Sequence, residues 1–151
     1  MNKAEKIKNR FKEIINSNNY LSLATINGEE PWVCTLYYCI DKHFNIYFIS
    51  QIDTLHVENI LINPKVAFTI FDSHQREGEG NGIQGSGRVE ILKDEKIDEG
   101  LKTYQTSFID LNRETLTEPF KYRLCKLIPE KFYILDPDSD EDKRVLVKLN
   151  R

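Results

Sequence analysis

Long apolar segments are absent from this sequence of 151 residues. No stretch approaches the roughly 20 uninterrupted apolar residues that cross a bilayer, so we expect no membrane span. The opening segment Met1–Lys6 is polar, and no apolar run follows it, which argues against a signal peptide. We therefore expect a cytoplasmic protein without a membrane partner.

Cysteine is scarce, and basic residues do not cluster. The three cysteines, Cys34, Cys39 and Cys125, form no Cys-x-x-Cys pair, and an odd number argues against a disulfide framework. We interpret them as reduced, mostly buried thiols; the alternative, a catalytic thiol, has no supporting motif nearby. The 21 basic and 24 acidic residues are spread along the chain and give a net charge of −3. A nucleic-acid partner is not expected, because it needs a clustered basic face.

Several catalytic and ligand-binding signatures are also missing. No G-x-S-x-G, H-E-x-x-H or Walker sequence is present. The segment 80–85 formally matches the dinucleotide pattern G-x-G-x-x-G, but a charged loop precedes it and no helix opens from it, so we reject that interpretation. We expect no metal site, since the spacing of the acidic and histidine side chains in the loop matches no standard set: Asp72, His74, Glu77 and Glu79.

The apolar residues that are present repeat with recognisable periods. Alternating, aromatic-rich segments predict strands over about 20–26, 32–40, 44–49, 65–71, 83–92, 122–128, 131–135 and 144–149. Helical spacing predicts helices over about 3–17, 54–62 and 94–108, the second capped by Asp53 or Thr54. Asn27-Gly28 is typical of a hairpin turn, and 122–135 has the pattern of a final hairpin. Glycines inside 83–92 indicate a bulge or a close backbone approach.

These elements predict one domain over residues 1–151. Its class is mainly β, a β-rich α+β domain, because about six hairpin-linked strands alternate with only a few helices. Strands joined in this way form an antiparallel, barrel-like sheet, with the helices at its periphery.

The turn after the third predicted strand carries a candidate anion site. Ser50, Thr54 and His56 lie beside the expected start of a helix, where unpaired N–H groups and the helix dipole favour a phosphate. From the residues alone ordinary roles are favoured at this point: Ser50 can satisfy the turn, Thr54 can cap the helix and His56 can lie at the surface. Gln84, on a strand with small neighbours, can hydrogen-bond a flat heterocycle or belong to a bulged barrel strand.

The order of three sequence pieces resembles the pyridoxamine 5′-phosphate oxidase-like, FMN-binding split β-barrel superfamily. The first piece, 31–38, leads through Asp41 into 46–50; the second runs from Thr54-Leu-His56 to Asn63-Pro64-Lys-Val-Ala67. The third is 82–92, and 120–136 is similar to the family's last hairpin. The resemblance implies a six-stranded antiparallel split β-barrel with peripheral α-helices.

The same resemblance implies a homodimer with FMN at the subunit interface. It places the FMN phosphate on Thr54 and His56 with Ser50 nearby, and the flavin ring along Thr35, Tyr37 and Gln84. Many relatives have Lys at the position of His56. The vitamin B6 oxidase itself has an Arg on the second strand, where this chain has Trp32-Val33, so the chain is expected to belong to another branch.

These features predict an FMN-binding flavoprotein, and a small oxidoreductase is the expected class of activity. No residue stands out as a general base, and the substrate is not readable from the sequence. Two alternatives stay open: a non-catalytic dimeric module that binds a flavin or haem, with His56 and His74 as the haem candidates, and a dimeric structural domain without a ligand.

Overall fold

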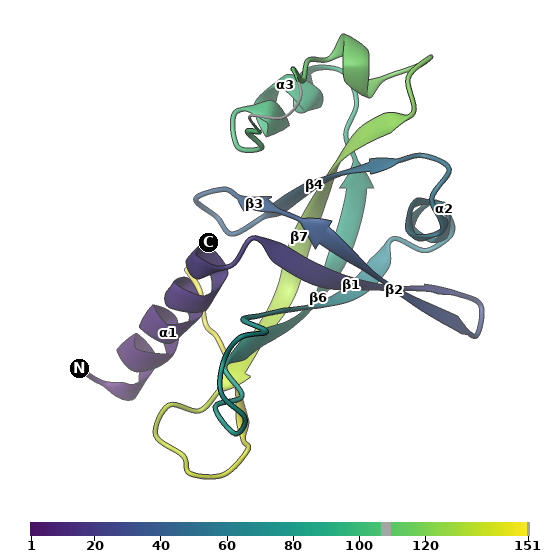
Figure 1. Ribbon diagram of the computed structural model, residues 1–151. Coiled ribbons are helices and arrows are strands. Elements are labelled where there is room, and N and C mark those ends of the chain that lie inside the picture. Colours follow the sequence, from purple (N-terminus) through teal and green to yellow (C-terminus); the bar gives the residue numbers. More distant parts are fainter. Residues whose placement is uncertain (107–109, 151) are drawn as a thin grey trace.

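A computed structural model describes residues 1–106 and 110–150 (Figure 1). Helix α1 (Lys3–Ser17) is followed by strands β1 (Tyr20–Asn27), β2 (Glu30–Tyr37), β3 (Cys39–Ile40) and β4 (Ile46–Gln51), then α2 (Leu55–Ile62), β5 (Lys65–Phe71) and β6 (Gly82–Ile91). Helix α3 (Glu95–Leu101), the short 3₁₀ helix η1 (Glu114–Leu116), β7 (Tyr122–Leu135) and β8 (Arg144–Leu146) complete the described chain. The predicted mainly β class is confirmed, with eight strands rather than about six.

All strand pairs are antiparallel and form one curled sheet. Its order is β2-β1-β5-β6-β7-β4-β3, with β8 added to β7. The sheet curls far enough that β2, at one end of this order, also contacts β4, the last strand but one at the other end. In the described chain, no helix is long and apolar enough to cross a membrane.

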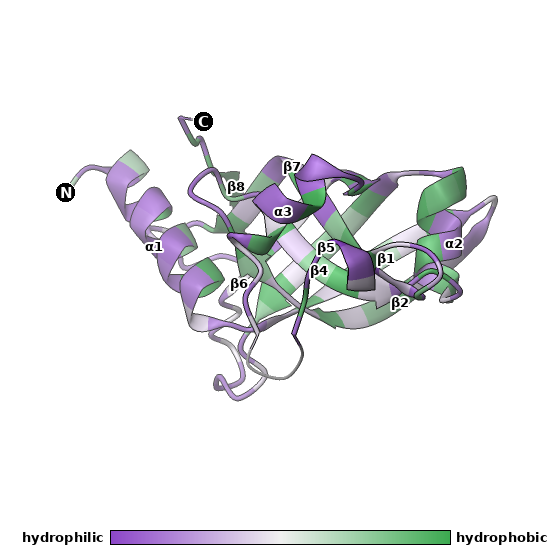
Figure 2. Cartoon of the chain, turned by 90° about the horizontal axis from the view of Figure 1, so that it is seen from above, coloured by the Kyte–Doolittle hydropathy of each residue, from purple (hydrophilic) through white to green (hydrophobic). Residues whose placement is uncertain are grey.

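Helix α1 begins with a reciprocal cap. Asn2 Oδ1 accepts a hydrogen bond from Glu5 N at 3.0 Å, and Asn2 N donates to Glu5 Oε2 at 2.9 Å. The helix is mostly hydrophilic, with hydrophobic residues on the side toward the sheet (Figure 2). That side buries Phe11, Ile14 and Ile15. The helix therefore covers the main core inside the curled sheet, as its period predicted.

A second, smaller core lies on the other face of β4 and β7. Tyr47 and Leu124 pack there with Ile97 of α3 and Leu116 of η1. The prediction of a helix over 94–108 was too long, since α3 ends at Leu101. Tyr104 N and Thr103 N both donate to Gly100 O, which tightens the chain into a turn. The remainder of that prediction, 107–108, falls outside the described residues.

The predicted final hairpin was wrong. Residues 122–135 form the single strand β7, because Pro129 and Glu130 make a bulge rather than a turn. Ser86 pairs with Lys131 and Gly87 with Pro129, which leaves Glu130 as the extra residue. Proline is tolerated at such a bulge since it has no N–H to pair. The glycines of β6 predicted a bulge or a close backbone approach: the register shift does lie at Gly87, but its extra residue is on β7, and Gly87 lies close to the backbone of Ile128.

Candidate functional site

The turn between β4 and α2 positions the predicted phosphate-binding residues. Strand β4 ends at Gln51, and Thr54 occupies the N-cap position of α2. The Thr54 hydroxyl donates to Gln51 O at 2.7 Å and does not cap the helix with its side chain. The Thr54 side chain therefore does not accept from the first N–H groups of α2. A helix start that binds an anion needs such uncapped N–H groups.

Ser50, Thr54 and His56 converge in this turn, and we call them the turn cluster. His56 Nε2 lies 2.7 Å from Ser50 Oγ and 3.4 Å from Thr54 Oγ1. Ser50 and His56 are buried, and Thr54 is half-buried. The sequence prediction that these three side chains lie together is consistent with this geometry, and His56 is not a surface residue.

Burial sets the protonation of His56. It lowers the pKa of the imidazole from its ordinary value of 6.5, because the charged form loses solvation. The ring is therefore neutral at pH 7 in the protein alone, and its Nε2 and Ser50 Oγ form a hydrogen bond in which the tautomer of the ring decides the donor. A phosphate beside the ring would raise the pKa again, since an anion stabilises the imidazolium.

Thr35 and Gln84 lie on the outward face of the sheet. Thr35 pairs with Ser22, Ser22 with Thr69, and Thr69 with Gln84, so these residues form one row across β2, β1, β5 and β6. Directly opposed residues of antiparallel strands point to the same face. At about 4.8 Å per strand, the ends of the row are about 14 Å apart along the sheet. Gln84 pairs with Tyr133 of β7, ten residues along that strand from Arg123, the partner of Ser50, so it is not brought against the turn cluster within one chain.

Tyr37 lies beside this row on β2. Its ring packs edge-on against Tyr20 at 5.7 Å and Tyr104 at 6.1 Å between centroids. Thr35 is exposed, and so is Tyr37. Strand β2 contacts both β4 and α2, the two elements that the turn cluster joins.

Sequence reasoning missed two buried polar residues near the turn. Arg123 of β7 pairs directly with Ser50 of β4, and only 9% of its side chain is exposed. Asn59 of α2 donates to Thr25 Oγ1 at 3.0 Å, while its own Oδ1 is buried with no partner among the described residues. Neither residue forms a motif with its sequence neighbours. The positions of both side chains depend on contacts between segments that are far apart in the sequence.

The geometry defines a curled antiparallel sheet with a small polar cluster at the start of its central helix. A family model described as pyridoxamine 5′-phosphate oxidase matches residues 7–136. The chain belongs to this family, which confirms the resemblance.

Three further comparisons show what the chain is similar to. A UPF0306 protein of Photorhabdus laumondii is 31% identical over 77 residues, which cover 50% of this chain and 54% of that protein. The chain thus spans about half the length of the curated relatives it matches. A Clostridium acetobutylicum protein related to general stress protein 26, of the pyridoxinephosphate oxidase family, superposes with a TM-score of 0.71 at 18% identity over 96% of each chain.

A haem-binding protein from Mycobacterium smegmatis has a TM-score of 0.68 at 15% identity, covering 97% of this chain and 59% of that one. At such identities the two structural matches show the shared fold alone.

Proposed function

We propose that the protein binds FMN through its phosphate at the turn cluster. The observation that carries the proposal is the convergence of two hydroxyls and one imidazole at the start of α2. This donor set suits a phosphate, because hydroxyls and helix N–H groups donate to its oxygens and a protonated imidazole adds charge. Membership of the pyridoxamine 5′-phosphate oxidase family supports a flavin as the rest of the ligand.

The residues of the cluster have separate tasks in this proposal. Ser50 donates its hydroxyl proton to a phosphate oxygen, and Thr54 would do the same after exchanging its bond to Gln51 O for one to the phosphate. The imidazole of His56 becomes protonated as the phosphate binds, and the charged ring then faces the ligand. Thr35 and Tyr37 border the flavin ring on the β2 side. When bound, FMN would supply hydride exchange at its N5, which is the basis for proposing a small oxidoreductase.

Replacing His56 with glutamine tests the phosphate position. We expect FMN affinity to fall about tenfold at pH 6 and much less at pH 8, since only the charged ring gives a charge-assisted bond. The direction of this pH dependence follows from the pKa of His56, which is low in the free protein and would be raised in the complex. The contribution of His56 to FMN affinity is therefore full at low pH and is lost as the pH rises through the pKa of the complex.

Fluorescence titration of FMN measures this affinity. Comparing wild type and variant at each pH removes the titration of the FMN phosphate itself, which both share. Replacing the exposed His43 with glutamine is the matched control and should change nothing. Equal losses for His56→Gln at pH 6 and pH 8 would show that the phosphate lies elsewhere.

Spectroscopy separates the flavoprotein from its alternatives. A flavin spectrum that is released on denaturation supports FMN, whereas a Soret band would point to haem. The buried His56, whose Nε2 is already held by Ser50, is poorly placed as a haem ligand. Anaerobic bleaching of the flavin by NADH or NADPH supports an oxidoreductase, and failure with both favours a non-catalytic binding module.

We also propose that the outward face of β2, β1, β5 and β6 is covered by a second copy of the chain. Exposed aromatic residues Tyr20, Tyr37 and Phe71 lie on these strands, together with the small Ala24 and Ala67. Small side chains allow a second sheet to approach closely. The face also carries the row from Thr35 to Gln84, so a partner seated there would meet both predicted ring contacts and place them at the interface.

Replacing Ala67 with arginine should therefore yield a folded monomer. Ala67 is exposed at the centre of this face, so the long charged side chain would block a partner without disturbing the core. Sedimentation velocity measures the mass, and circular dichroism checks the fold. Replacing the exposed Glu13 of α1 with arginine should leave a dimer. An Ala67→Arg protein with the mass of the wild type would contradict this interface.

A further inference from the structure

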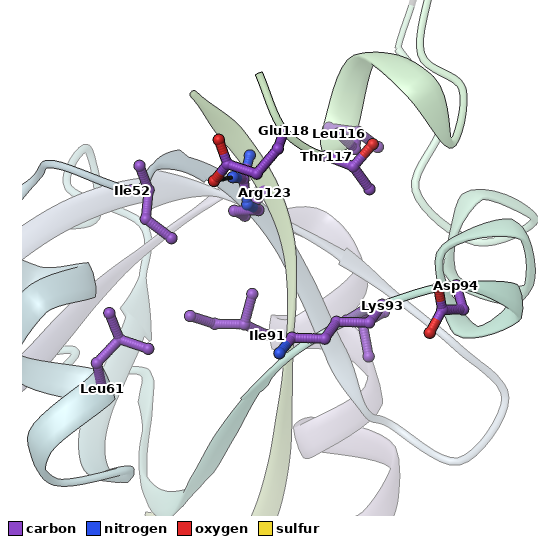
Figure 3. Close-up of a pocket in the computed structure, with 10 residues that line it drawn as sticks. Ile52, Leu61, Ile91, Lys93, Asp94, Leu116, Thr117, Glu118 and Arg123 are labelled. Carbon is purple, nitrogen blue, oxygen red and sulfur yellow. Dashed lines mark hydrogen bonds and ion pairs between the residues drawn. The ribbon is translucent and has the colours of Figure 1, made fainter. Parts of the chain in front are cut away.

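A pocket of about 440 Å³ lies between the end of α2, the end of β6 and η1. Its size falls within the range of small-molecule sites. Apolar side chains contributed by four different segments form much of its wall (Figure 3): Ile52, Leu61, Ile91 and Leu116. No member of the turn cluster lines it, so it is a separate cavity.

One buried cation reaches this pocket. The Nη1 of Arg123 donates to Phe120 O at 2.6 Å and to Tyr122 O at 2.8 Å, which fixes the guanidinium in place. Its Nη2 donates to Glu118 Oε1 at 2.6 Å. The structure gives no partner for Nε within the described chain. Arg123 is thus held by backbone carbonyls and keeps donors that can serve another acceptor.

The counter-ion of Arg123 is unusually exposed. Only 9% of the Arg123 side chain is accessible, whereas 85% of the Glu118 side chain is. The carboxylate can therefore rotate into solvent and regain its own hydration, whereas the guanidinium stays where it is. A buried guanidinium without a carboxylate is strongly unfavourable, so another carboxylate that enters the pocket would take the place of Glu118.

We propose that this pocket binds an amphiphilic monocarboxylate, with its acid group on Arg123 and its apolar part between Leu61 and Ile91. Lys93 extends across the floor of the pocket toward Ile91 and adds a second cation near the ligand (Figure 3). Asp94 lines the far side and would repel a carboxylate placed there, which leaves Arg123 as the position for the acid group. The proposal does not depend on FMN.

Isothermal titration calorimetry of the 151-residue chain with octanoate tests the proposal, with 1-octanol as the uncharged probe of equal chain length. We expect octanoate to bind at least about tenfold more tightly than octanol, as a charge-assisted hydrogen bond requires. Equal affinity for the two probes, or no binding of octanoate, would overturn the proposal.

The variant Glu118→Gln gives the sharpest test, because it removes the competing carboxylate from an exposed position. Octanoate affinity should rise about two- to fivefold, the range expected for an exposed ion pair. The matched control is Glu114→Gln on η1, an exposed carboxylate outside the pocket, which should have no effect. Unchanged or weaker binding by Glu118→Gln would overturn the proposal.

The variant Arg123→Met removes the charge while keeping an unbranched apolar stem. If it folds, octanoate affinity should fall about ten- to a hundredfold and approach that of octanol. A folded Arg123→Met protein with wild-type affinity for octanoate would contradict the assignment. If this variant does not fold, the comparison with octanol and the Glu118→Gln variant still test whether the pocket binds a carboxylate.

Discussion

Replacing Phe11 with alanine is expected to lower the free energy of unfolding by about 3–5 kcal/mol. Phe11 is fully buried and is the largest of the three side chains that α1 buries. Its ring centroid lies 4.7 Å from that of Phe132 and 5.1 Å from that of Phe44. Alanine would lose the transfer energy of the ring and leave a cavity, and the rigid strands around it cannot close that cavity.

Urea titration followed by circular dichroism measures this loss. The neighbouring Lys12 is exposed on the same helix, so Lys12→Ala is the matched control and should stay within about 0.5 kcal/mol of wild type. A loss below about 1 kcal/mol for Phe11→Ala would show that α1 is not an integral part of the core.

The second large effect is expected at Gly85, where β6 passes directly over an aromatic ring. A Cβ at this position would overlap Phe68 Cζ and lie 2.7 Å from Cε1 and from Cε2. Phe68 is buried and packs against Phe132 at 5.8 Å between centroids, so its ring has little room to move. Gly85→Ala should therefore lower the free energy of unfolding by about 3 kcal/mol through overpacking.

A compensating change makes this prediction specific. Leucine at position 68 is shorter than phenylalanine and leaves space for the new methyl group. The double variant Gly85→Ala, Phe68→Leu should be more stable than the sum of the two single losses predicts. Ser86→Ala, one residue along the strand, is the control with a change of similar size. Strict additivity in thermal or urea unfolding would rule out a direct clash between the methyl group and the ring.

The sequence predicted those parts of the fold that depend on local patterns. Helix α1, the hairpin around Gly28 and strand β5 follow from period and turn chemistry, and their bounds were close to those observed. Strand β7 was misread because Ile128-Pro129-Glu130 has the composition of a turn, although pairing with β6 holds these residues in a bulge. A local pattern cannot show which partner strand will override it.

The candidate site divides in the same way. The turn cluster was found because Ser50, Thr54 and His56 are close in sequence and one turn joins them. The row from Thr35 to Gln84 and the pairing of Ser50 with Arg123 depend on the register between strands. The burial of His56, which lowers its pKa, depends on the packing of α2, so the sequence alone could not predict it.

Strand β7 has a consequence for motion. Its first half pairs with β4, its middle and second half pair with β6, and its end also pairs with β8. Opening it would require several ladders of hydrogen bonds to break together, whereas β2 and β3 lie at the two ends of the sheet. Backbone amides of β7 should therefore exchange with solvent most slowly, through near-global unfolding. Arg123 stands on this strand two residues before its pairing with β6 begins, so its guanidinium is joined directly to the part of the molecule that opens least.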